Sequence, residues 1–164
     1  MPGEAKVGVA VEISLGKKKI LAVSSGGGHW VELIRLSSAL ERKVVVYATV
    51  DKAYRWAAGS ARFYTILDVT RWNILRWVST FVKLAYILLR DKPAVVISTG
   101  ALPGYFSLRL AKWLGIKTIW IDNIANVEEL SLSGQSIGNY ADLWLTQWTQ
   151  LAKRGGPLYR WAVL

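Results

Sequence analysis

The segment SSGGGHW, residues 24–30, joins three consecutive glycines to the only histidine of the chain. An apolar run precedes it and residues at helical spacing follow it, so it lies where a strand would turn into a helix. Glycine accepts positive φ and lets a ligand approach the backbone closely, and the free N–H groups of a helix start attract anions. The segment therefore favours a site for a phosphate or diphosphate.

Two other interpretations of these residues stay open. The glycines could serve only to make a tight turn between strand and helix, and His29 could be an ordinary polar residue at a helix start. The segment is not a P-loop, since no Gly-Lys-Ser/Thr follows, and its spacing is not that of a dinucleotide-binding motif. The pattern thus predicts an anion near this turn without defining which anion it is.

Two later strand ends also carry polar residues and glycines. Residues 98–105, STGALPGY, form a second glycine-bearing loop, and residues 121–123, IDN, place Asp122 and Asn123 after a third apolar run. If the strands are parallel, all three strand ends converge at the edge of the sheet where ligands bind in such folds. Asp122 could also be only a turn or helix-cap residue.

Apolar runs and helical spacings alternate along the chain. Strands are expected at residues 20–25, 43–50, 61–69, 94–100, 117–123, 143–148 and 157–164, the third of them less securely parallel than the others. Helices are expected at residues 30–40, 71–90 and 103–114. Continuous runs of Val, Ile and Leu that alternate with helices are typical of a parallel sheet covered on both faces. The predicted fold class is therefore α/β, with a Rossmann-like parallel sheet.

The composition fits one globular domain with an anionic partner. The 164 residues carry a net charge of +10, nine tryptophans and no cysteine, which excludes disulfides and thiolate metal sites. The charge favours nucleic acid, anionic lipid or a phosphorylated substrate. No nucleic-acid-binding module accompanies the basic residues, so nucleic acid is not an expected partner. We interpret residues 1–17 as a loose leader and residues 18–164 as the domain.

The expected helix at residues 71–90 has more apolar surface than a sheet-covering helix needs. Arg76, Lys83 and Arg90 lie seven residues apart on one stripe, which also includes Thr80. These charges argue against a membrane-spanning helix. A helix that lies in the membrane interface would instead place its apolar residues in the lipid and its basic residues on the headgroups. The expected membrane contacts are Trp72, Arg76, Trp77, Phe81 and Lys83. The alternative is burial within the domain together with a contact between subunits.

Three segments of the chain resemble one known family. They are similar, in this order and at matching spacing, to bacterial relatives of the membrane-recruiting, acceptor-side subunit of dolichyl-diphosphate-chitobiose synthase, including PssD-like subunits of exopolysaccharide glycosyltransferases. The segments are SSGGGHWVELIRL, VVISTGALPGY and IWIDNIANVEELSLSGQSIGNYADLWLTQW. The resemblance covers roughly residues 18–164. It implies the N-terminal, acceptor-side half of a GT-B glycosyltransferase such as MurG.

The resemblance also implies roles for individual residues. His29 would be catalytic, as a general base on the acceptor hydroxyl, or would position the acceptor's diphosphate. Residues of the two glycine loops would bind this diphosphate, namely Ser25, Gly26, Gly27, Gly28, Thr99, Gly100, Gly104 and Tyr105. Asp122 and Asn123 would be polar residues at the edge of the site. No metal and no further cofactor is expected, because a separate subunit would bind most of the UDP-sugar.

The expected function follows from this resemblance. The chain would be the membrane-associated, acceptor-binding subunit of an inverting, UDP-sugar-dependent hexosyltransferase, inactive without its partner chain. Its acceptor would be a polyprenyl-diphosphate-linked glycan in cell-surface polysaccharide or lipid-linked oligosaccharide synthesis. Its place would be the cytoplasmic face of the cell membrane, on anionic lipid. The alternatives are a non-catalytic recruiter of a soluble glycosyltransferase and an independent nucleotide-binding Rossmann-type protein.

Overall fold

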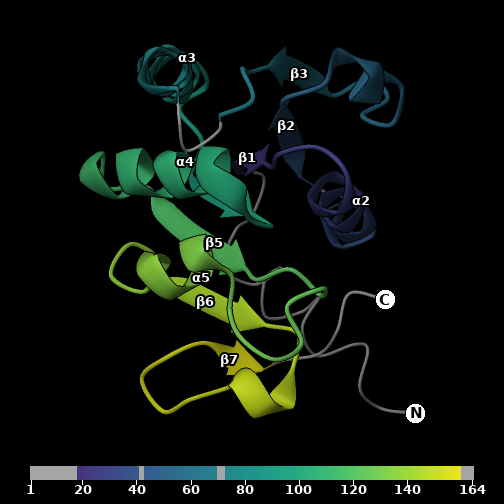
Figure 1. Ribbon diagram of the computed structural model, residues 1–164. Helices are drawn as coiled ribbons and strands as arrows, with labels where there is room; N and C mark the ends of the chain where they lie inside the picture. The colour runs from purple at the N-terminus through teal and green to yellow at the C-terminus, as the bar shows by residue number, and fades with distance from the viewer. Residues whose placement is uncertain (1–17, 41–42, 70–72, 160–164) are drawn as a thin grey trace.

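The computed structural model describes residues 18–40, 43–69 and 73–159 (Figure 1). The elements in chain order are β1 (Lys19–Val23), α2 (Gly28–Arg35), η1 (Leu36–Leu40), β2 (Val44–Thr49), η2 (Lys52–Trp56), β3 (Arg62–Thr65), α3 (Ile74–Asp91), β4 (Val95–Ser98), α4 (Ala101–Trp113), β5 (Lys117–Ile121), α5 (Leu132–Ile137), β6 (Leu143–Thr146), η3 (Thr149–Leu151) and β7 (Leu158–Tyr159). Each predicted strand is present, and the first six are shorter than predicted. The predicted leader and residues 160–164 lie outside the described residues.

The seven strands form one parallel sheet in the order β3-β2-β1-β4-β5-β6-β7. The predicted Rossmann-like α/β class is confirmed, and β3, whose direction the sequence indicated least securely, is parallel to β2. Leu21 of β1 is paired with Val46 on one side and with Val96 on the other. The strand order therefore reverses between β1 and β4. At such a reversal the carboxyl ends of the strands leave a crevice in which ligands bind.

Helices cover both faces of the sheet because successive strand residues point to opposite faces. Leu21 packs in the larger core cluster with Leu84 of α3 and Leu108 of α4. Ala22 points the other way and packs with Trp30 of α2. Figure 1 shows α3, α4 and α5 on one face and α2 on the other. The two helices that begin at the reversal, α2 and α4, are thus held against opposite faces.

The helix predicted at residues 71–90 differs from expectation in its start and in one face. It begins at Ile74, because the Asn73 side chain accepts a hydrogen bond from the Arg76 N–H at 3.1 Å and caps the helix. Thr80 does not share an exposed polar stripe with Arg76: it is buried, and its hydroxyl donates to the Leu67 carbonyl at 3.1 Å. The threonine satisfies its polar group locally and therefore fits the buried side of the helix.

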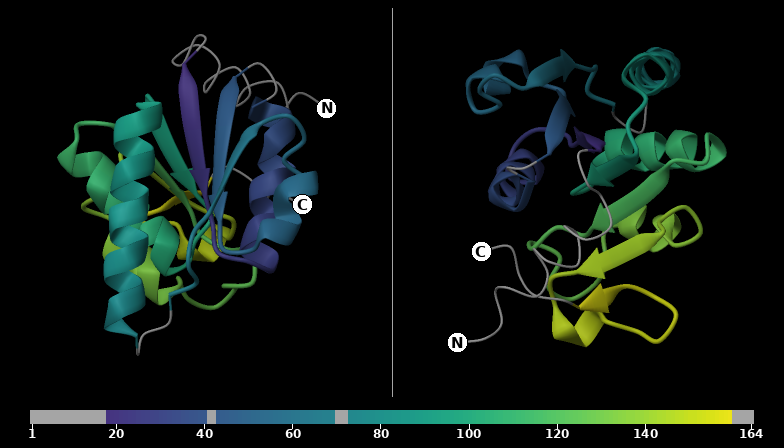
Figure 2. Two further views of the ribbon diagram at one scale, coloured as in Figure 1. Left: turned by 90° about the horizontal axis from the view of Figure 1, so that it is seen from above. Right: turned by 180° about the vertical axis from the view of Figure 1, so that it is seen from behind.

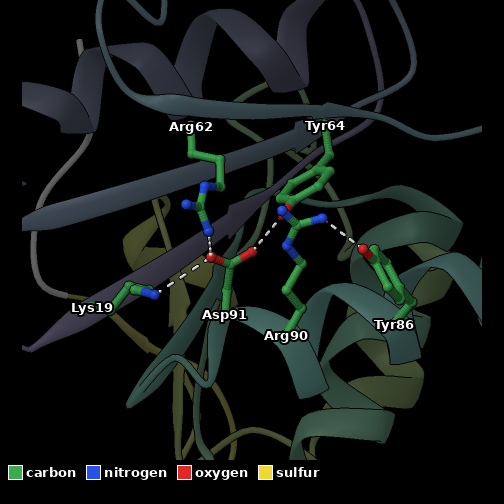
Figure 3. Close-up of polar contacts among 6 residues, drawn as sticks. All are labelled: Lys19, Arg62, Tyr64, Tyr86, Arg90 and Asp91. Carbon is green, nitrogen blue, oxygen red and sulfur yellow. Dashed lines mark hydrogen bonds and ion pairs between the residues drawn. The ribbon is translucent and has the colours of Figure 1, made fainter.

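The last residue of α3 fixes the other end of this helix (Figure 3). The Asp91 carboxylate is fully buried and accepts hydrogen bonds from Tyr64 Oη at 2.7 Å, from Lys19 Nζ at 3.4 Å and from Arg62. Burial alone would raise the pKa of Asp91, but these three donors outweigh it and hold the pKa below its ordinary value. Lys19 and Arg62 begin β1 and β3, so the cluster ties α3 to the amino edge of the sheet.

Candidate functional site

A pocket of about 610 Å³ opens at the carboxyl edge of the sheet, beside the reversal of strand order. It lies between the first turn of α2, the first residue of α4 and the loop that follows β5. Its lining residues are Gly28, His29, Ala101, Asn123, Ala125, Asn126, Glu129, Leu130, Ser131, Leu132 and Ser133. The volume suits a small organic ligand or part of a larger one. Of the predicted site residues, Gly28, His29 and Asn123 line this pocket.

His29 connects the two strand ends that flank the reversal. Its Nδ1 lies 2.9 Å from the Thr99 carbonyl oxygen, and the Thr99 hydroxyl donates in return to the His29 carbonyl at 2.7 Å. Gly100 comes next, with φ +135°, and a Cβ on it would stand 2.5 Å from Cε1 of the imidazole. Thr99 and Gly100 therefore hold the histidine ring, and the ring's Nε2 has no hydrogen-bond partner among the residues that the structure describes.

The groups of the pocket that could bind an anion are backbone N–H groups rather than basic side chains. α2 and α4 begin with Gly27 and Gly100 as cap residues, and neither start receives a side-chain cap or an acidic residue in its first turn from the described residues. No lysine or arginine lines the described pocket. Uncapped N–H groups at two helix starts attract a negatively charged group. In the described part of the chain no group of His, Asp and Glu could hold a metal ion.

The first glycine loop is shaped by an aromatic side chain from η2. The Gly27 N–H, at φ +62°, donates to the Tyr54 hydroxyl at 3.0 Å. The Tyr54 ring is stacked on Trp30 at 5.2 Å between centroids. The Ser25 carbonyl accepts a hydrogen bond from the Thr49 hydroxyl. A Cβ on Gly26 would contact Val50 and Tyr54. Ser25, Gly26 and Gly27 thus form the turn and do not line the pocket.

Glu32, which the sequence did not single out, is the buried acid of the site. It lies one helical turn after His29, and only 3% of its surface is exposed. Its carboxylate accepts hydrogen bonds from Asn123 Nδ2 at 2.9 Å, from the Ile124 N–H at 2.7 Å and from Gln147 Nε2 at 3.2 Å. Burial raises the pKa of Glu32, and the hydrogen bonds and the nearby His29 only partly oppose this. One signal was available: Glu32 is the only acidic residue among residues 18–40.

The two polar residues predicted at the third strand end have different partners. Asp122 is buried and accepts hydrogen bonds from the N–H and the hydroxyl of Ser131, at 3.0 and 2.6 Å. Ser131 in turn caps α5 through the Gly134 N–H. Asn123 points the other way, with Nδ2 at 3.1 Å from His29 Nδ1. Asp122 therefore shapes the loop that walls the pocket, while Asn123 lies beside the histidine.

Gly104 and Tyr105 lie away from the pocket, within the packing of α4. A Cβ on Gly104 would stand 1.9 Å from the Ser98 hydroxyl oxygen, so this glycine lets α4 approach β4 closely. The Tyr105 ring lies against Phe106 and Tyr140, with the Arg109 guanidinium 5.6 Å from its centroid. The structure thus brings the histidine loop close to Thr99 and Gly100, whereas Gly104 and Tyr105 do not line the pocket.

The residues predicted to contact membrane fall on different sides of α3. Arg76 and Lys83 are exposed, whereas Trp77 and Phe81 are half-buried, with their rings 5.5 and 6.4 Å from Phe106 of α4. Trp72 lies outside the described residues. No helix in the described ranges is long and apolar enough to cross a membrane.

A different set of α3 residues forms an exposed apolar stripe. Its members are between 52% and 83% exposed: Ile74, Leu75, Val78, Val82, Tyr86 and Leu89. At about 100° per residue these side chains lie next to one another on the helix, and Arg76, Lys83 and Arg90 run along one border of the stripe. The first turn of α3 projects beyond the carboxyl ends of the strands (Figure 2, left). The stripe therefore reaches the same end of the molecule as the pocket.

Comparison with known proteins places the chain in a family. Residues 61–162, more than half of the chain, match the family model described as Alg14, oligosaccharide biosynthesis protein Alg14 like. The chain belongs to the Alg14 family. The UDP-N-acetylglucosamine transferase subunit ALG14 of Candida albicans is 27% identical over 84% of this chain and 74% of its own length. The subunit of the same name from Homo sapiens is 27% identical over 82% of this chain and 77% of its own.

Solved structures support the fold of this Alg14 family member. The crystal structure of MurG from Acinetobacter baumannii superposes with a TM-score of 0.72 at 12% sequence identity, over 87% of this chain. The chain spans 45% of the MurG chain. A UDP-N-acetylglucosamine 2-epimerase superposes with a TM-score of 0.64 over 43% of its chain. The predicted likeness to the N-terminal half of a GT-B glycosyltransferase is therefore confirmed at the level of the fold.

Proposed function

We propose that this chain is the acceptor-binding, membrane-associated subunit of a UDP-sugar-dependent glycosyltransferase that acts on a lipid-diphosphate-linked glycan. The observation that carries the proposal is the pocket at the strand-order reversal, where the only histidine of the chain adjoins two uncapped helix starts. Family membership adds the class of reaction, because the Alg14 relatives are named as UDP-N-acetylglucosamine transferase subunits. By this proposal the donor is UDP-N-acetylglucosamine.

The lining of the pocket offers groups for both parts of such an acceptor, the diphosphate and the sugar. The helix starts at Gly28 and Ala101 would bind the diphosphate, since neither has a side-chain cap or an acidic residue in its first turn to compete for the N–H groups. Asn126 and Glu129, in the loop after β5, and Ser133 of α5 also line the pocket and offer hydrogen-bonding groups to a sugar. The proposal assigns them to the sugar because Glu129 beside a diphosphate would repel it.

His29 supplies the group that can move a proton. In an inverting transfer the acceptor hydroxyl attacks the anomeric carbon from the face opposite the UDP group, the bond to UDP breaks, and a base takes the hydroxyl proton. Imidazole Nε2 in its neutral form accepts such a proton. We assign this role to His29, whose Nδ1 is held by Thr99 while Nε2 has no partner among the described residues. The UDP-sugar would come from a separate subunit, without which the chain would be inactive.

The exposed stripe of α3 supports association with a membrane surface. Apolar side chains bordered by Arg76, Lys83 and Arg90 match a helix that lies in the interface, with its cations on anionic headgroups. The first turn of α3 reaches beyond the carboxyl ends of the strands (Figure 2, left), and the pocket is lined by residues that follow those strand ends. A lipid-linked acceptor would then enter the pocket without leaving the bilayer.

The proposal is tested by an assay of sugar transfer from UDP-N-acetylglucosamine to a polyprenyl-diphosphate-linked sugar. The chain, a separately expressed UDP-sugar-binding subunit and the mixture of both are compared. We expect transfer only from the mixture, and a loss of about 100-fold or more in kcat for His29→Ala. Full transfer by this chain alone would contradict the two-subunit arrangement.

A matched variant separates catalysis from recruitment of the partner to the membrane. Ser38, an exposed residue of η1, is changed to Ala as the control for His29→Ala. Both variants should form the complex as the natural chain does, which is measured by co-sedimentation with the partner. If His29→Ala retains full turnover in that complex, the chain is a non-catalytic recruiter.

A further inference from the structure

The amide of Asn123 has only one orientation that satisfies its neighbours. Its Oδ1 accepts a hydrogen bond from the Ala125 N–H at 2.8 Å, and its Nδ2 donates to Glu32 Oε2 at 2.9 Å. A backbone N–H can only donate and a carboxylate can only accept, so rotation of the amide by 180° would break both bonds. Asn123 therefore presents a donor, and not an acceptor, to the histidine ring beside it.

Nδ1 of His29 consequently lies between groups with opposite requirements. The Thr99 carbonyl at 2.9 Å can only accept, so it favours a proton on Nδ1. Asn123 Nδ2 at 3.1 Å can only donate, so it favours a bare Nδ1 with the proton on Nε2. Each neutral tautomer of the ring thus finds a hydrogen bond at Nδ1. The protein therefore stabilises both neutral tautomers, whereas most histidines in folded proteins are held in one tautomer by a single hydrogen-bond partner.

Glu32 is the residue that fixes the donor in place. Its two carboxylate oxygens accept from Asn123, Ile124 and Gln147, which come from the ends of β5 and β6. Because all three partners are donors, the group they fit is an ionised carboxylate without a proton of its own. Glu32 and His29 both lie on α2, so the hydrogen bonds of Glu32 fix the ends of β5 and β6 relative to the histidine.

We propose that Glu32, acting through the amide of Asn123, is a positioning residue that keeps His29 divided between its two neutral tautomers. With the proton on Nδ1, Nε2 accepts a proton. With the proton on Nε2, the ring donates a hydrogen bond. Resting on the proposed function, this gives one histidine both tasks: it takes the proton of the acceptor hydroxyl, or it binds an oxygen of the diphosphate.

The test uses the full chain and no substrate. Since His29 is the only histidine, ¹⁵N-histidine labelling gives one imidazole, and long-range ¹H–¹⁵N spectra in alkaline buffer report the neutral tautomers directly. We expect both ring nitrogens of the natural chain at intermediate chemical shifts. In Asn123→Ala and in Glu32→Gln the two ¹⁵N shifts should move apart. One should take the value of a protonated Nδ1 that donates to Thr99, and the other the value of an unprotonated Nε2.

Asn126→Ala is the control, because this residue lines the same pocket without a hydrogen bond to the ring. It should keep the intermediate shifts. A single tautomer in the natural chain, unchanged in both variants, would overturn the proposal. Two different variants guard against a folding defect in one, since Glu32→Gln keeps the size of the side chain and circular dichroism checks each fold.

A second readout connects the tautomers to transfer by the complex with the partner. Glu32→Gln should keep kcat nearly unchanged and raise the acceptor KM about fivefold or more, because the ring stays in the form whose Nε2 accepts a proton and loses the form that donates to a diphosphate oxygen. A fall in kcat with an unchanged KM would contradict the role in dividing His29 between its tautomers. If the natural chain shows no transfer at all, the proposed function fails, while the spectra still decide the tautomers.

Discussion

The imidazole of His29 occupies the space where a side chain at position 100 would be. A Cβ built on Gly100 would stand 2.5 Å from Cε1 and 2.6 Å from Nδ1 of the ring. Real Cβ contacts are longer than this, so position 100 accommodates either a side chain or the observed histidine. The glycine after β4 therefore serves the histidine loop after β1, although about 70 residues separate them in the sequence.

Gly100→Ala should displace the His29 ring and lower the free energy of unfolding by about 1–3 kcal/mol, from strain at φ +135° and the steric clash together. Urea denaturation and the transfer assay measure both effects. Gly115→Ala is the matched control, because Gly115 has φ +70° but no heavy atom within 4 Å of its Cβ position. It should cost only about 1 kcal/mol of backbone strain and leave transfer unchanged. Equal losses of transfer in both variants would exclude the specific clash.

Gly104→Ala should destabilise the protein by about 1–3 kcal/mol through overpacking against β4, since its Cβ would stand 1.9 Å from Ser98 Oγ. Ser98→Ala removes that oxygen and leaves only a contact at 3.0 Å. The double variant should therefore recover part of the loss, as a double-mutant cycle measures. Strict additivity of the two changes would argue that Gly104 does not act through this contact and would favour its predicted role in binding the diphosphate.

Asp91→Asn should lower the free energy of unfolding by about 1–3 kcal/mol at neutral pH, because buried hydrogen bonds to a charged acceptor are lost. The folded-state pKa of Asp91 lies below its ordinary value of 3.8. Its contribution is thus fully present above about pH 4 and is lost as the pH falls through the lowered pKa. The difference from the natural chain should shrink in acid. Asp68→Asn, at an exposed position, is the control at neutral pH and should change the free energy of unfolding by less than about 0.5 kcal/mol.

Val82→Ser should weaken binding to vesicles of phosphatidylglycerol and phosphatidylcholine about fivefold, since roughly 1 kcal/mol of apolar transfer is lost. Val82 is 61% exposed on the α3 stripe. Val44, 56% exposed at the start of β2, is the matched control. Flotation of both variants distinguishes a lipid-binding stripe from a general loss of surface hydrophobicity. An equal drop for Val44→Ser would remove α3 as the membrane contact.

The parts of the site that follow from strand topology could be predicted from the sequence. Apolar runs that end in SSGGGH and STG indicated parallel strands with convergent carboxyl ends, and His29 indeed contacts Thr99 across the reversal of strand order. The loop after β5 could not be predicted in the same way. Its path depends on the hydrogen bonds that Ser131 donates to the Asp122 carboxylate and that Trp148 Nε1 donates to the Ile124 carbonyl, which no periodicity of the sequence indicates.

The directions of individual side chains could not be predicted from the sequence either. Glu32 is a common helix-surface residue type, and only the position of Gln147 and Ile124 in the fold makes it the centre of a buried network. Trp77 and Phe81 were expected at the membrane because the helix has more apolar surface than packing on the sheet requires, yet their rings lie against Phe106 of α4. Packing partners from a neighbouring helix decide such positions, and these partners are distant in sequence.

The first turn of α3 projects past the carboxyl ends of the strands, and this has a consequence for kinetics. With the proposed membrane contact, the acceptor reaches the pocket by lateral diffusion in one leaflet. The relevant substrate quantity is then a surface density, in molecules per lipid, and adding empty vesicles would slow transfer at a constant total amount of acceptor. Measured rates should accordingly collapse onto one curve when plotted against the mole fraction of acceptor in the membrane.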